Sequence, residues 1–158
     1  MQIPGLMALA VLAGMTACGT SAASGGDATT DAYVGCNGDK RVNLTAFPMD
    51  VASNDGALTL RFLSADPSVP LAGENTWTMS VQTATGAKAD ITAIAGAAFM
   101  PDHGHSSTKT PLITQQPDGT WKLQEIYLTM AGVWRLTLTL KQPGSADTTA
   151  VVFVCVPG

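Results

Sequence analysis

Residues 134–141 read Trp-Arg-Leu-Thr-Leu-Thr-Leu-Lys, the clearest pattern in the chain. Large apolar side chains alternate there with polar ones, at Trp134, Leu136, Leu138 and Leu140. Successive side chains of a β-strand point to opposite faces of its sheet. The alternation therefore predicts a strand with one face in a hydrophobic core and the other in water.

Further strand patterns lie on both sides of this stretch, separated by Gly- and Pro-containing turns. They cover residues 58–62, 77–82 and 121–128, the apolar run 150–156 and, less cleanly, Ile91, Ala93 and Ala95. The part of the chain after the N-terminal segment shows no convincing helical pattern. The sequence thus predicts an all-β fold, an Ig-like antiparallel β-sandwich of about seven strands. The last three strands are expected to form a meander.

The apolar positions change parity within residues 121–128. Trp121 and Leu123 share one parity, whereas Ile126 and Leu128 share the other. One extra residue in the strand would bring both pairs to the same face, so the pattern predicts a β-bulge near residues 124–125.

Length and charge narrow the functional classes. The 158 residues suit a single domain, and 46% of them are hydrophobic, which argues against disorder. With 8 Lys and Arg against 12 Asp and Glu, the net charge is -4. This balance gives no basic surface for phosphates, so we expect no nucleic-acid partner.

The N-terminus reads as an export signal. Residues 1–17 carry no charge and contain a short apolar stretch, and the sequence Met-Thr-Ala-Cys ending at Cys18 resembles a bacterial lipobox. We therefore predict a lipoprotein signal peptide at 1–17, a flexible tether at 18–32 lipidated on Cys18, and a folded domain at 33–158. Resemblance to Gram-negative lipoproteins favours the outer membrane, with the domain facing the periplasm. The alternative is plain cleavage, with Cys18 an incidental thiol.

Two cysteines remain, Cys36 near the start of the predicted domain and Cys155 near its end. Exported proteins fold in an oxidising compartment, so we expect these two residues to form a disulfide.

The candidate chemistry lies in residues 99–107, Phe-Met-Pro-Asp-His-Gly-His-Ser-Ser, which contain both histidines of the chain. Pro101 and Gly104 predict a loop here. Imidazole nitrogens and thioethers bind copper well, so the candidate metal ligands are Met100, His103, His105 and, from a separate segment, Met130. Asp102 is a candidate for orienting an imidazole, or it caps the turn. In the alternative interpretation, the histidines bind nothing and the loop is only a rigid turn.

Catalysis has little support in the sequence. Ser106 and Ser107 lie near His105, but catalytic triads are assembled from separated segments, and no paired carboxylates or phosphate-binding glycine motif appears. We therefore expect no enzyme.

Three short elements together resemble the YtkA-like (FixH/YtkA) domain family: residues 73–77, 100–105 and 130–134. The family's signature positions fall on Met100, Pro101, His103, Gly104, His105, Met130, Gly132 and Trp134. The resemblance implies a non-enzymatic, extracytoplasmic Ig-like sandwich on a lipoprotein or membrane anchor. FixH-type relatives are linked to cation transport and to assembly of a copper-containing oxidase, which implies copper as the cofactor and an envelope protein as a partner. The rival interpretation is an Ig-like interaction or structural module.

Overall fold

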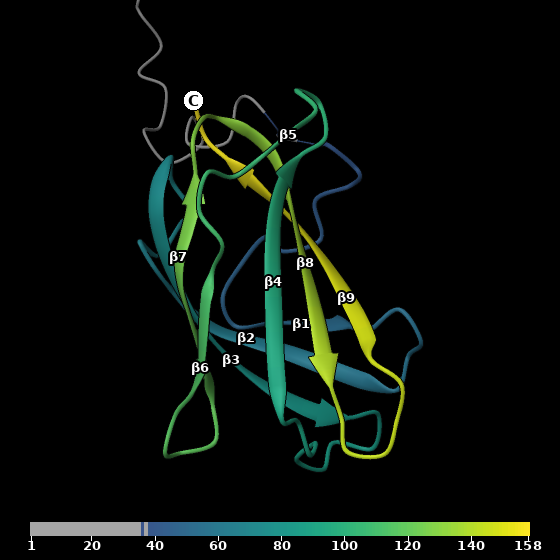
Figure 1. Ribbon diagram of the computed structural model, residues 1–158. Helices are drawn as coiled ribbons and strands as arrows, with labels where there is room; N and C mark the ends of the chain where they lie inside the picture. Colours follow the sequence, from purple (N-terminus) through teal and green to yellow (C-terminus); the bar gives the residue numbers. More distant parts are fainter. Residues whose placement is uncertain (1–35, 37) are drawn as a thin grey trace, which may run out of the picture.

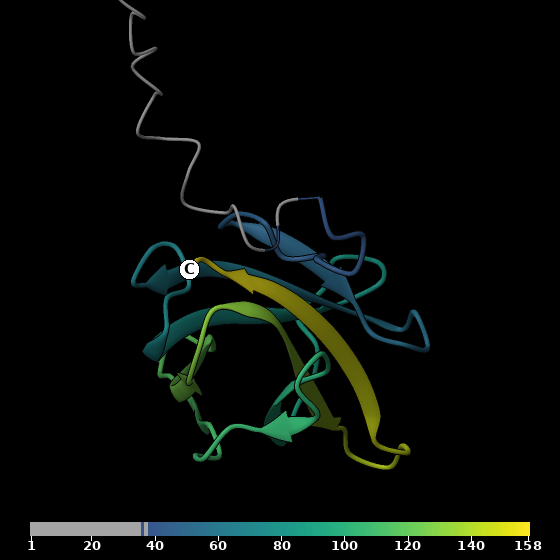
Figure 2. The same ribbon diagram turned by 90° about the horizontal axis from the view of Figure 1, so that it is seen from above.

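In the described residues, 36 and 38–158, nine β-strands form two antiparallel sheets in the computed structural model. The two sheets face each other, as Figure 1 shows from the side and Figure 2 from above. The five-stranded sheet has the order β1 (Met49–Ala52), β2 (Leu58–Asp66), β3 (Gly73–Thr83), β7 (Trp121–Leu128) and β6 (Leu112–Gln115). The four-stranded sheet has the order β5 (His105–Ser106), β4 (Ala93–Met100), β8 (Gly132–Lys141) and β9 (Thr148–Val156). This arrangement confirms the predicted antiparallel β-sandwich.

The predicted signal peptide 1–17, the tether 18–32 and the lipidation site Cys18 lie outside the described residues. Within the described part of the chain, no helix is long and apolar enough to cross a membrane.

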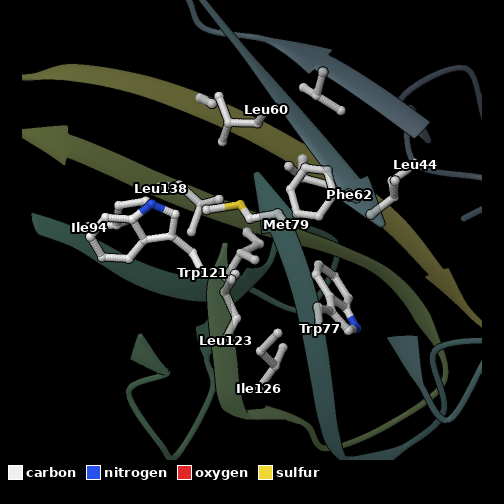
Figure 3. Close-up of a cluster of buried hydrophobic side chains, with 14 of the residues drawn as sticks. Leu44, Leu60, Phe62, Trp77, Met79, Ile94, Trp121, Leu123, Ile126 and Leu138 are labelled. Atoms are coloured by element: carbon white, nitrogen blue, oxygen red, sulfur yellow. The ribbon is translucent and has the colours of Figure 1, made fainter. Parts of the chain in front are cut away.

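The core lies between the two sheets and follows the alternation of the sequence. Along β8, Trp134, Leu136, Leu138 and Leu140 are buried in this core, and Val133 is buried on the opposite face. Figure 3 shows Met79 of β3 between Phe62 of β2 and Leu138 of β8, and all three side chains are fully buried. Apolar side chains from both sheets therefore fill one continuous core.

The predicted bulge in β7 is confirmed. Asn75 pairs with Ile126 and Trp77 pairs with Leu123, so β7 has one residue more than β3 over the same span. Glu125 lies within this extra length and has a positive φ of 55°. As a result, the apolar residues on both sides of the bulge face the core.

The strand count differs from the expected number because β1, β5 and β6 are short. They contain 4, 2 and 4 residues, and alternation is not recognisable over so few positions. Of the apolar positions at residues 91–95, Ile91 is buried as predicted, but the prediction was wrong for Ala93 and Ala95. β4 begins at Ala93, with Ile94 buried and both Ala93 and Ala95 exposed.

The predicted meander of the last three strands was wrong as well. β7 belongs to the five-stranded sheet, whereas β8 and β9 pair in the other sheet. Residues 129–131 therefore cross from one sheet to the other. Alternation shows which face of a strand is buried, but not which sheet the strand joins.

The predicted disulfide between Cys36 and Cys155 is present, with a Cα–Cα distance of 5.5 Å. Both cysteines are buried and pack with Val133 of β8. The bridge thus fixes the segment at Cys36 to the end of β9, at the end of the sandwich that also carries β5 (Figure 1).

Replacing both bridged cysteines, Cys36→Ser with Cys155→Ser, should lower the free energy of unfolding by about 2–5 kcal/mol, because the bridge constrains the unfolded chain. Urea denaturation of the parent and the variant measures this difference. Adding a reductant to the parent should reproduce the loss and should leave the variant unchanged. Equal stability of the oxidised parent and the variant would contradict a stabilising bridge.

Candidate metal centre

The two histidines lie on the hairpin formed by β4 and β5. Met100, the last residue of β4, pairs with His105, the first residue of β5. The turn between them is closed at the Met100 carbonyl, which accepts hydrogen bonds from the backbone N–H groups of His103 (3.3 Å) and Gly104 (2.9 Å). Gly104 has a φ of +68°, which glycine adopts readily. The predicted loop is confirmed at residues 101–104, whereas Met100 and His105 themselves belong to strands.

His105 has a defined orientation. Its Nδ1 lies 3.2 Å from the Ser106 carbonyl oxygen, which accepts a hydrogen bond in the tautomer that is protonated at Nδ1. Its ring also packs edge-to-face against Trp134, with centroids 5.6 Å apart. In that tautomer the lone pair of the neutral ring is on Nε2, the arrangement in which a backbone carbonyl prepares an imidazole for a metal.

His103 lies beside His105 on the exposed side of the turn. The two ring centroids are 6.0 Å apart, with an angle of 70° between the planes. An ion bound about 2.0–2.1 Å from one nitrogen of each ring would lie roughly 3 Å from each centroid. The distance between the two centroids is therefore short enough for one ion to bridge the rings when a nitrogen of each ring is turned toward it.

The two candidate methionines have different environments. Met100 is 1% exposed, and its methyl group fills the space that a side chain on Gly132 would need. Met130 is 38% exposed, and its carbonyl accepts a hydrogen bond of 2.9 Å from Nε1 of Trp134. Trp134 thus connects the Met130 segment with His105, whereas the Met100 thioether belongs to the core.

Asp102 does not contact either imidazole through a hydrogen bond. Its two carboxylate oxygens accept from Nη1 (2.7 Å) and Nη2 (2.8 Å) of Arg41. These hydrogen bonds lower the pKa of Asp102 below its usual range. Arg41 also holds the pKa of Asp39 at about 2, and the two carboxylates raise the pKa of the guanidinium.

Sequence reasoning did not identify Arg41 and Asp39 as part of this site. Arg41 and Asp102 are 61 positions apart, and no motif links them. Trp134, by contrast, was recognisable in the sequence, since it is the last residue of the family-like element 130–134. Around these histidines and elsewhere in residues 36 and 38–158, no group of three or more His, Cys, Asp or Glu side chains is placed to hold one metal ion.

Comparison with known proteins finds only distant structural similarity. No family model and no curated protein matches the chain. A copper-bound variant of FetP from uropathogenic Escherichia coli has a TM-score of 0.43 and 13% identity, covering 67% of this chain and 93% of its own. The copper-reconstituted P19 protein from Campylobacter jejuni has a TM-score of 0.43 and 10% identity, covering 70% and 98%. These scores and identities are too low to assign a family or a ligand, and the YtkA-like resemblance stays a prediction.

The contact between Gly132 and Met100 makes a side chain at position 132 costly. Gly132→Ala should lower the free energy of unfolding by about 2–4 kcal/mol, because the new methyl group meets Met100 at a φ of +129°. Gly73→Ala is the matched control, since Gly73 also has a large positive φ, +108°, but no neighbouring atom within 4 Å. Its expected cost is about 1 kcal/mol. Equal losses in urea denaturation would show that crowding by Met100 has no effect.

Proposed function

We propose that this protein binds copper through His103 and His105 and acts as a non-enzymatic copper-binding or copper-handling domain of a bacterial envelope lipoprotein. One observation carries the proposal. The His105 ring lies between the Ser106 carbonyl and Trp134, and its centroid is 6.0 Å from that of the second imidazole. Ligands held in place before binding lose little conformational freedom when the ion arrives.

The available donors favour copper over other ions. Affinity for nitrogen ligands peaks at Cu²⁺ among the divalent first-row metals, and thioethers select Cu⁺. Of the two candidate thioethers, Met130 is exposed and Met100 is enclosed in the core. We therefore propose His103, His105 and Met130 as ligands, with Met100 as structural support.

The disulfide supports a location outside the cytoplasm, since such bridges persist in oxidising compartments. The proposal includes export by the signal peptide 1–17 and membrane attachment through lipid on Cys18. The outer membrane, facing the periplasm, is the proposed site, with an envelope protein as the partner that delivers or receives copper.

The hydroxyl groups near the histidines support a non-catalytic role. Ser107 Oγ donates a hydrogen bond of 2.6 Å to the Tyr127 carbonyl oxygen. A serine activated as a nucleophile would instead donate to a general base such as an imidazole. Ser107 thus has a structural partner, and the imidazoles stay available to a metal.

Copper titration of the parent and of the double variant His103→Ala with His105→Ala tests the proposal. The variant should bind Cu²⁺ at least about tenfold more weakly, and parental binding should weaken on acidification because imidazole binds metals only when neutral. Circular dichroism checks that the variant keeps the sandwich. Unchanged affinity would reject the site and favour the interaction module in which the loop is a rigid turn.

A second titration, with Cu⁺, tests the thioether. Met130→Leu should weaken Cu⁺ binding by roughly tenfold and leave Cu²⁺ binding nearly unchanged, because thioether is the soft ligand of the set. Met49→Leu is the matched control: Met49 is a partly exposed methionine of β1 whose sulfur accepts a hydrogen bond from the Thr45 backbone. An equal effect of the two substitutions would remove Met130 from the ligand set.

A further inference from the structure

The sequence Asp102-His103-Gly104-His105 offers a carboxylate and two imidazoles within four residues. Such a set would suit harder ions such as Zn²⁺, which takes carboxylate oxygen as well as imidazole nitrogen. The structure assigns the carboxylate elsewhere, because both oxygens of Asp102 are bound by Arg41. We propose that Arg41 determines the metal selectivity of the loop by keeping Asp102 out of the ligand set. This inference rests on the proposed function.

Arg41 and Asp102 form a bidentate ion pair. Nη1 donates to Oδ1 at 2.7 Å and Nη2 donates to Oδ2 at 2.8 Å. Paired hydrogen bonds of this kind fix the orientation of the carboxylate as well as its position. In this orientation Asp102 does not form a metal-holding group with His103 and His105, so the carboxylate has to move off the guanidinium to join them.

Arg41 is itself held in place before it meets Asp102. Its Nε donates to Asp39 at 3.0 Å and its Nη2 at 2.6 Å, and its backbone N–H donates to the same carboxylate at 2.9 Å. The Asp39 N–H in turn donates to the carbonyl of Cys36, which the disulfide ties to β9. The guanidinium therefore loses little further freedom when it binds Asp102.

The consequence is a softer ligand set. With Asp102 engaged, the hairpin presents two imidazoles, to which the proposed function adds the thioether of Met130. With Asp102 released, the same loop presents two nitrogens and an oxygen, a combination that favours Zn²⁺ relative to Cu⁺. Arg41 thus acts on selectivity without contacting the metal.

Titration of the full chain with Zn²⁺ and with Cu⁺ tests this proposal. Arg41→Ala should tighten Zn²⁺ binding by roughly tenfold, the scale on which single changes around a metal site act, and should leave Cu⁺ binding nearly unchanged. In Arg41→Ala with Asp102→Asn, the Zn²⁺ gain should disappear, because the amide is a poorer ligand. Lys40→Ala is the matched control, since it removes the same charge from the neighbouring exposed position.

The outcomes separate the two proposals. Suppose first that the parent binds Cu⁺. The selectivity role of Arg41 is then rejected, and copper binding stands, if Arg41→Ala does not bind Zn²⁺ more tightly than the parent. The same holds if the tighter Zn²⁺ binding persists without the Asp102 carboxylate or also follows Lys40→Ala. If the parent binds neither ion, the proposed function fails, and the inference fails with it. Exposed ion pairs contribute little to stability, so the thermal transition should stay close to that of the parent.

Discussion

The indole of Trp134 is the constraint on which the histidine end of the molecule depends. Trp134 is 1% exposed and belongs to the continuous core of β8, so the packing of both sheets fixes its position. Its nitrogen donates to the Met130 carbonyl, and its ring contacts His105. A residue placed by the hydrophobic effect therefore positions a polar, half-exposed imidazole. The precision of the candidate site derives from the core beneath it rather than from the loop alone.

A second support comes from outside the core. Cys36 begins a short segment that the disulfide attaches to the end of β9, and the turn after it places Arg41 against Asp102. Close packing thus holds the His105 strand, whereas an ion pair holds the Asp102 carboxylate in the turn beside it. The two supports differ in their response to conditions: packing persists in salt, whereas exposed ion pairs weaken as ionic strength rises.

Much of the fold follows from the alternation of side chains, because the period of a strand is two and a shift of one residue reverses its faces. The same rule located the bulge of β7, since the change of parity at residues 124–125 has no other simple cause. It failed for β5, whose two residues show no period, and for the path from β7 to β8, which changes sheet. Of the site, the histidines and Trp134 had sequence signals, but Arg41 had none, because only the folded chain brings it to Asp102.

A rigid turn and a metal site are compatible descriptions of this hairpin. Free imidazoles in a flexible loop would have to be ordered by the ion, and that cost would reduce its affinity. Here the hydrogen bond from the Gly104 N–H to the Met100 carbonyl closes the turn, and the buried Met100 side chain packs against Gly132. The contacts that close the turn are therefore those that the proposed metal site needs, because that site has few ligands. Met100 contributes by packing, whereas Met130 is exposed at the surface.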